Sequence, residues 1–86
     1  MAIQFTLARC KTRAGFSAKL PQSVKLNLKN IEQEFETILK TPILLVLKVH
    51  EIEIIVHGYG ELLFKNSENV EVMKNIAEKI YRAGLK

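Results

Sequence analysis

Residues 43–65 read ILLVLKVHEIEIIVHGYGELLFK, an apolar stretch that is interrupted by two short polar segments. In the first half Ile43, Leu45, Leu47 and Val49 share one parity, and in the second half Ile52, Ile54 and Val56 share the other, as in strands that turn one face to a core. A two-residue turn at His50-Glu51 resolves the pairing of these halves, although such turns prefer Gly or Asn. The pairs that it places opposite each other on one face are Val49 with Ile52, Leu47 with Ile54, and Leu45 with Val56.

A second turn, at Gly58-Tyr59-Gly60, continues this register. It places Val56 opposite Leu62 and Ile54 opposite Phe64, on the same face as the first set of pairs. The stretch therefore predicts a three-stranded antiparallel meander with one complete apolar face that packs against helices.

The other face of this meander is the predicted functional surface. It carries Lys48, Glu53 and Lys65 in one row, and it also carries the apolar residues Leu44, Val46, Ile55 and Leu63. If both helices pack on the first face, these four residues form an exposed apolar patch of the size that marks interfaces. We expect self-association through this patch. The alternative is that a short loop or the N-terminal hairpin folds over it.

The flanking segments complete the predicted fold. Residues 3–8 and 16–20 alternate like two strands of a hairpin or of a bulged, bent pair, with Lys11–Gly15 between them. Leu28, Ile31, Phe35, Ile38 and Leu39 share a helical face; Asn27 or Asn30 caps this helix and Thr41-Pro42 ends it. A second amphipathic helix begins near Asn66 or Ser67, and Gly84 suits the left-handed position that follows its last turn.

Together these segments predict a single α+β domain over residues 1–86. Its expected architecture is a two-layer sandwich of order β-β-α-β-β-β-α. The sheet has five, mostly antiparallel strands, and both helices lie on one face.

Composition favours a cytoplasmic protein. Apolar residues make up 48% and charged residues 26% of the chain, which is typical of globular domains. The single cysteine, Cys10, excludes an intramolecular disulfide, and we interpret it as a small buried thiol. No signal peptide or membrane-spanning stretch is visible, so we expect no membrane partner.

Positive charge is concentrated in the first third of the chain. Residues 1–29 contain no acidic residue, whereas the whole chain has a net charge of +4. A basic segment can bind nucleic acid, and the candidate residues are Arg9, Lys11, Arg13, Lys19 and Lys25. The alternative is a solvated, lysine-rich surface.

Catalytic chemistry and metal binding are not indicated by any motif. His50 and His57 lie at opposite ends of one predicted strand, roughly 20 Å or more apart, which is too far to share a metal. We therefore expect no metal, no cofactor and no catalytic residue, and a non-enzymatic binding or assembly module. The alternative is an enzyme or a small-ligand-binding protein whose site forms at a subunit interface near His57, Tyr59 and Glu61.

Two stretches resemble the repeat unit of the TATA-box-binding protein family. Residues 25–31 (KLNLKNI) are similar to its strand-to-helix transition, in which a polar cap sits between two leucines. Residues 52–84 are similar to its closing section: a strand, a Gly-containing hairpin, a second strand and an amphipathic helix that ends in Gly. In its general look the chain also resembles small uncharacterised α/β proteins of archaeal genomes.

The resemblance implies a curved antiparallel sheet with both helices on its convex side. In the family, paired repeats form a saddle whose concave face lies on the DNA minor groove, so a single repeat would have to form a homodimer. The intercalating phenylalanines of the family do not carry over, since the corresponding places are His57 and residues 40–41. Neither place offers an aromatic wedge for kinking DNA.

Overall fold

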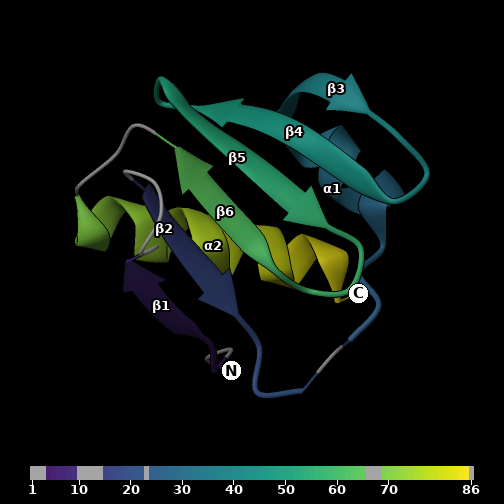
Figure 1. The fold of residues 1–86 in the computed structure, drawn as a ribbon. Coiled ribbons are helices and arrows are strands. Elements are labelled where there is room, and N and C mark those ends of the chain that lie inside the picture. The colour runs from purple at the N-terminus through teal and green to yellow at the C-terminus, as the bar shows by residue number, and fades with distance from the viewer. Residues whose placement is uncertain (1–3, 10–14, 23, 66–68, 86) are drawn as a thin grey trace.

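The computed structural model describes residues 4–9, 15–22, 24–65 and 69–85. The elements in chain order, shown in Figure 1, are β1 (Thr6–Arg9), β2 (Gly15–Lys19), α1 (Leu28–Glu34), β3 (Glu36–Lys40), β4 (Leu44–Val49), β5 (Ile52–His57), β6 (Leu62–Lys65) and α2 (Val70–Gly84). The predicted α+β class is confirmed.

The strands of the described residues form one antiparallel sheet in the order β1-β2-β6-β5-β4-β3. The sheet has six strands, so the predicted five-strand count is wrong, and the additional strand is β3 at one edge (Figure 1). The connection from β2 to β3, which contains α1, carries the chain to that far edge. Because β1 and β3 are both edge strands, the sheet is open.

The predicted N-terminal hairpin is present in the described residues. Strands β1 and β2 pair from Thr6 opposite Lys19 to Arg9 opposite Phe16. Phe5 and Leu7 pack against the core, as their parity predicted. The two strands extend the sheet beside β6, so they do not fold over the predicted apolar patch.

The register of the meander is confirmed at every predicted pair. The paired residues are Val49 with Ile52, Leu47 with Ile54, Leu45 with Val56, Ile54 with Phe64, and Val56 with Leu62. At the first turn, His50 and Glu51 have φ angles of 51° and 70°. These left-handed conformations match the twist of the hairpin but are costly for residues other than glycine.

Helix α1 begins as predicted but ends early. Asn27 caps it, since its side-chain oxygen accepts a hydrogen bond of 3.3 Å from the Asn30 N–H. The prediction that this helix continues to Thr41-Pro42 is wrong, because the backbone is already extended at Phe35 and residues 36–40 form β3. Ile38 and Leu39, predicted on the buried helical face, are 52% and 53% exposed on this strand.

Pairing with β4 explains this difference. Thr41 closes a tight turn at Pro42-Ile43: its N–H donates to the Leu44 carbonyl at 2.9 Å, and its hydroxyl oxygen accepts from the Leu44 N–H at 2.9 Å. The turn brings residues 36–40 back along β4, where they satisfy backbone groups that a longer helix would leave at a bare sheet edge. The β-branched Thr37 and Ile38 also favour a strand.

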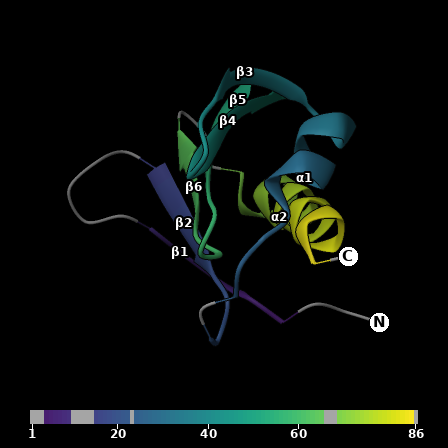
Figure 2. The ribbon, with the colours of Figure 1, turned by 90° about the vertical axis from the view of Figure 1, so that its right-hand side faces the viewer.

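Both helices lie on the same side of the sheet in Figure 2. One cluster of buried side chains joins this sheet face to the helices. Its members include Leu45, Leu47, Ile54, Val56, Leu62 and Phe64 from the strands, Ile31 from α1, and Met73, Ile76, Ala77, Ile80 and Tyr81 from α2. The central strands thus use alternate residues for the core, which leaves the other residues on the open face.

Gly84 has a different role from the predicted one. It belongs to the last turn of α2, and the glycine with a positive φ among the described residues is Gly60, at 111°. A Cβ atom on Gly84 would lie 2.8 Å from the Ile31 Cδ1 atom and 3.2 Å from the Leu26 Cβ atom. Its missing side chain therefore lets α1 and the preceding segment approach α2 closely. At the other end Asn69 caps α2, whereas the predicted caps Asn66 and Ser67 lie outside the described residues.

Candidate interface on the open sheet face

An apolar row crosses the middle of the open face, which Figure 1 views with α2 behind the strands. The sheet register aligns its four members, one from each strand from β3 to β6. We call Leu39, Val46, Ile55 and Leu63 the apolar row. Val46, Ile55 and Leu63 are half-buried by their neighbours, whereas Leu39 is 53% exposed. Predicted residues Val46, Ile55 and Leu63 thus do lie together, and Leu44 lies beside them on β4.

A charged row runs beside the apolar row, and its signs alternate. Lys48 lies opposite Glu53 and Glu53 opposite Lys65, as predicted, and Glu36 of β3 adds a fourth member opposite Lys48. We call Glu36, Lys48, Glu53 and Lys65 the charged row. The three ion pairs found among the described residues lie elsewhere: Lys19 with Glu61, Lys40 with Glu32, and Arg82 with Glu78.

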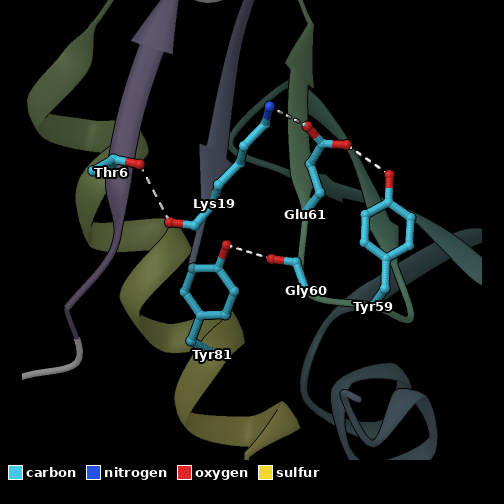
Figure 3. A network of polar contacts seen from close by, with 6 residues as sticks. All are labelled: Thr6, Lys19, Tyr59, Gly60, Glu61 and Tyr81. Carbon is cyan, nitrogen blue, oxygen red and sulfur yellow. Dashed lines mark hydrogen bonds and ion pairs between the residues drawn. The ribbon is translucent and has the colours of Figure 1, made fainter. Parts of the chain in front are cut away.

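A turn cluster of polar residues lies at one end of the open face. We define the turn cluster as Lys19, His57, Tyr59 and Glu61. The Tyr59 hydroxyl donates to Glu61 Oε1 at 2.7 Å, and Glu61 Oε2 lies 3.5 Å from Lys19 Nζ (Figure 3). The His57 and Tyr59 rings stack, with centroids 5.2 Å apart and an interplanar angle of 17°. The three residues named for a small-ligand site are therefore neighbours.

Electrostatics limit what this cluster can do. The hydrogen bond to Glu61, with smaller contributions from burial and from the negative charge of Glu61, raises the pKa of Tyr59. The hydroxyl therefore stays protonated at neutral pH and is a poor nucleophile. The cluster is suited to recognition through an exposed aromatic ring and two charged groups.

Tyr81 anchors the same turn from the core side. Its hydroxyl donates to the Gly60 carbonyl at 2.7 Å (Figure 3), and its ring packs against Phe5 with centroids 5.4 Å apart. Burial, with a further contribution from the charge of Glu61, raises the pKa of Tyr81, so this donor is retained at any physiological pH. The turn that carries Tyr59 is thereby fixed relative to α2.

The three candidate nucleic-acid residues that the structure describes, Arg9, Lys19 and Lys25, lie in different parts of the fold. Arg9 lies over the Phe16 ring, 5.5 Å from its centroid, and Lys19 belongs to the turn cluster. Lys25 lies in the segment before α1, beside a separate groove. Lys11, Arg13 and Cys10 lie outside the described residues.

That groove is a feature that sequence reasoning missed. It has a volume of about 890 Å³ and lies between residues 24–29, the Pro42-Ile43 turn, the Gly58-Tyr59 turn and the end of α2. Backbone hydrogen bonds connect three of its lining segments: the Leu26 N–H donates to the Gly58 carbonyl at 2.8 Å, and the Gly58 N–H donates to the Ile43 carbonyl at 2.9 Å. Ile43, 72% exposed, is its most accessible apolar side chain. The sequence grouped Ile43 with the core-facing residues Leu45, Leu47 and Val49, and this prediction is wrong, because Ile43 lies in the turn before β4 and not on the strand.

Groups of three or more metal-ligating side chains were not found within the part of the chain that the structure describes. Within the same described residues, no helix is both long enough and apolar enough to cross a membrane. Comparison of the chain with protein-family models, with curated proteins and with solved structures gave no match.

Proposed function

We propose that this protein is a non-enzymatic assembly module, a two-layer sandwich that associates with a second copy of itself through its open sheet face. The observation that carries the proposal is the apolar row: four large aliphatic side chains lie on four adjacent strands, on the face opposite the core. The described residues that could have covered them, those of the N-terminal hairpin, instead extend the sheet.

The size of the surface is sufficient for a specific contact. A two-fold pair that covers the central strands would bury on the order of 1,000 Å² in total, which is the lower limit of specific interfaces. At about 25 cal/mol per Å² of apolar area, burial of this face provides a large gross driving force, although the entropy lost on association consumes much of it. Face-to-face packing of two sheets about 10 Å apart is also a common arrangement in proteins.

The experiment is sedimentation equilibrium of the wild type and of Ile55→Lys. We expect the wild type to approach twice the 9.8 kDa chain mass at 100 μM, and Ile55→Lys to be a folded monomer. Val70→Lys is the matched control, because Val70 is 40% exposed at the start of α2, away from the sheet. A wild type that stays monomeric at 100 μM, or an Ile55→Lys variant that unfolds, contradicts the proposal.

A second candidate function is small-ligand binding or catalysis at the turn cluster. The observation that favours it is the proximity of His57, Tyr59 and Glu61, which were named from the sequence as an alternative site. In a face-to-face dimer this cluster would lie at the rim of the interface. A Tyr59→Ala variant should then lose binding of any ligand that stacks on the ring while it keeps the dimer mass.

A further inference from the structure

The order of the charges across the open face has a symmetry of its own. From β3 to β6 the charged row reads Glu36, Lys48, Glu53 and Lys65, so that its signs are minus, plus, minus, plus. Reflection about the line between β4 and β5 exchanges β4 with β5 and β3 with β6. After this exchange each residue of the charged row occupies the position of a residue with the opposite charge: Glu36 exchanges with Lys65, and Lys48 exchanges with Glu53.

The apolar row shares the same midline. Leu39 and Val46 lie on one side of it, and Ile55 and Leu63 lie on the other. The row continues into β2 and β1 with the smaller residues Ser17 and Ala8, so its bulk is centred on the β4–β5 line. Both rows are therefore complementary to themselves about one axis.

We propose that two copies pack face to face about a two-fold axis that runs parallel to the strands, above the line between β4 and β5. This inference rests on the proposed self-association and specifies its geometry. Rotation about this axis leaves the position of each row along the strand direction unchanged. It places β4 of one copy over β5 of the other, and β3 over β6. Lys48 then faces the Glu53 of the second copy, Glu36 faces its Lys65, and Val46 faces its Ile55.

The competing axis, which runs across the strands along the charged row, is disfavoured by charge. It keeps the strand order, so that Glu36 faces the same residue of the second copy, and Lys48 does likewise. Like charges that face each other across an interface strongly oppose association. The strand-parallel axis instead forms four opposite-charge contacts at the exposed edge of the interface, where little desolvation is needed.

Glu36 and Lys65 are the residues that test this axis. Within one chain they lie on β3 and β6, three strand spacings or roughly 14 Å apart. At physiological salt, solvent ions largely screen the interaction between two exposed charges at this distance. If the effects of the two substitutions on the dimer dissociation constant are not additive, the two residues therefore interact between copies and not within one chain. Both side chains are exposed, so their replacement leaves the core intact.

The experiment compares Glu36→Lys, Lys65→Glu and the double variant by sedimentation at moderate salt. Each single variant creates like-charge contacts between the copies, and it should raise Kd about tenfold or more. The double variant restores opposite charges between the copies, and it should return Kd to within about threefold of the wild type. Contacts within one chain cannot produce this rescue. In the double variant residue 36 is a positive charge beside Lys48 and residue 65 is a negative charge beside Glu53, so both contacts within the chain are repulsive.

Two failures are distinguishable. If the double variant loses as much affinity as both single variants together, the strand-parallel axis is wrong, although the open face can still be the interface. If the wild type is monomeric at every concentration, the proposed self-association fails and the axis fails with it. Circular dichroism of each variant checks that the fold is retained.

Discussion

Ile54 and Ile55 are adjacent isoleucines that point to opposite faces of β5, and their replacement by alanine should have very different costs. Ile54 is fully buried between Leu47 and Phe64 of the neighbouring strands. Ile55 lies between Val46 and Leu63 and is half-buried on the open face. The two substitutions remove the same atoms, so that the difference reports the environment alone.

The magnitude follows from burial. Replacing isoleucine by alanine removes three carbon atoms, each worth about 0.8 kcal/mol when fully buried. A cavity among the rigid side chains of the core adds to this, so Ile54→Ala should lower the free energy of unfolding by about 2–4 kcal/mol. That is a large share of the stability of a small domain. Ile55→Ala should cost about 1 kcal/mol or less in the monomer, since water already reaches part of this side chain.

Urea unfolding followed by circular dichroism measures both values. The protein concentration should be low enough that dimer formation does not contribute to stability. Equal costs for the two variants, or a larger cost for Ile55→Ala, would refute the assignment of the faces. A slip of the register by one residue would have this effect, because it exchanges every inward side chain for an outward one.

Three further predictions concern other parts of the chain. Gly84→Ala should destabilise the protein by about 1–2 kcal/mol despite the better helix propensity of alanine, because the new methyl group meets Ile31 and Leu26; a gain in thermal stability would contradict this. Replacing His50-Glu51 by Asn-Gly should stabilise the protein by about 1 kcal/mol in urea unfolding, because both positions are left-handed, and an unchanged midpoint would count against the turn geometry. Nucleic-acid binding by the basic segment should weaken steeply with salt, and charge reversal at Arg9, Lys11 and Arg13 should flatten that dependence; undetectable binding at about 50 mM salt and micromolar protein would remove this function.

The meander could be predicted from the sequence because its two turns fix one register. With turns at His50-Glu51 and at Gly58-Tyr59-Gly60, the residues of one parity from all three strands fall on one face, and the structure has that register. The positions of Val46, Ile55 and Leu63 on the open face follow directly. The charged row also follows, except for Glu36, which joins it only because residues 36–40 form a strand.

Strand β3 could not be predicted, because its apolar residues fit a helix equally well. Phe35, Ile38 and Leu39 continue the spacing of Leu28 and Ile31, so local periodicity favoured one long helix. The deciding contribution is not local. Without β3, strand β4 would have unpaired backbone groups at its outer edge, and Thr41 closes the turn that lets residues 36–40 pair with them. Pairing across the sheet therefore outweighs the local pattern.

The turn cluster was predicted as a set, but its contacts were not. His57 and Glu61 follow from the register, because the His57 N–H donates to the Glu61 carbonyl across the turn at 2.8 Å. Lys19 could not be assigned to this cluster, since it depends on β2 pairing with β6, residues far apart in the sequence. The groove beside Ile43 likewise combines four segments that only the tertiary fold brings together.

The solvent accessibility of three isoleucine methyl groups measures directly whether two copies bury the open sheet face. Ile54 is in the core, Ile43 is 72% exposed beside the groove, and Ile55 lies at the centre of the apolar row. A soluble paramagnetic probe attenuates the NMR signals of methyl groups that it can reach. The experiment is a concentration series of the methyl-labelled wild type, from about 10 to 500 μM. Ile54 serves as the protected reference and Ile43 as the exposed reference within the same molecule.

If two copies bury the open sheet face, the attenuation of the Ile55 methyl signal should depend on protein concentration. It should be attenuated at low concentration and should become as protected as that of Ile54 at high concentration, while Ile43 remains attenuated throughout. An Ile55 signal that is attenuated equally at every concentration would contradict burial of the open sheet face between two copies.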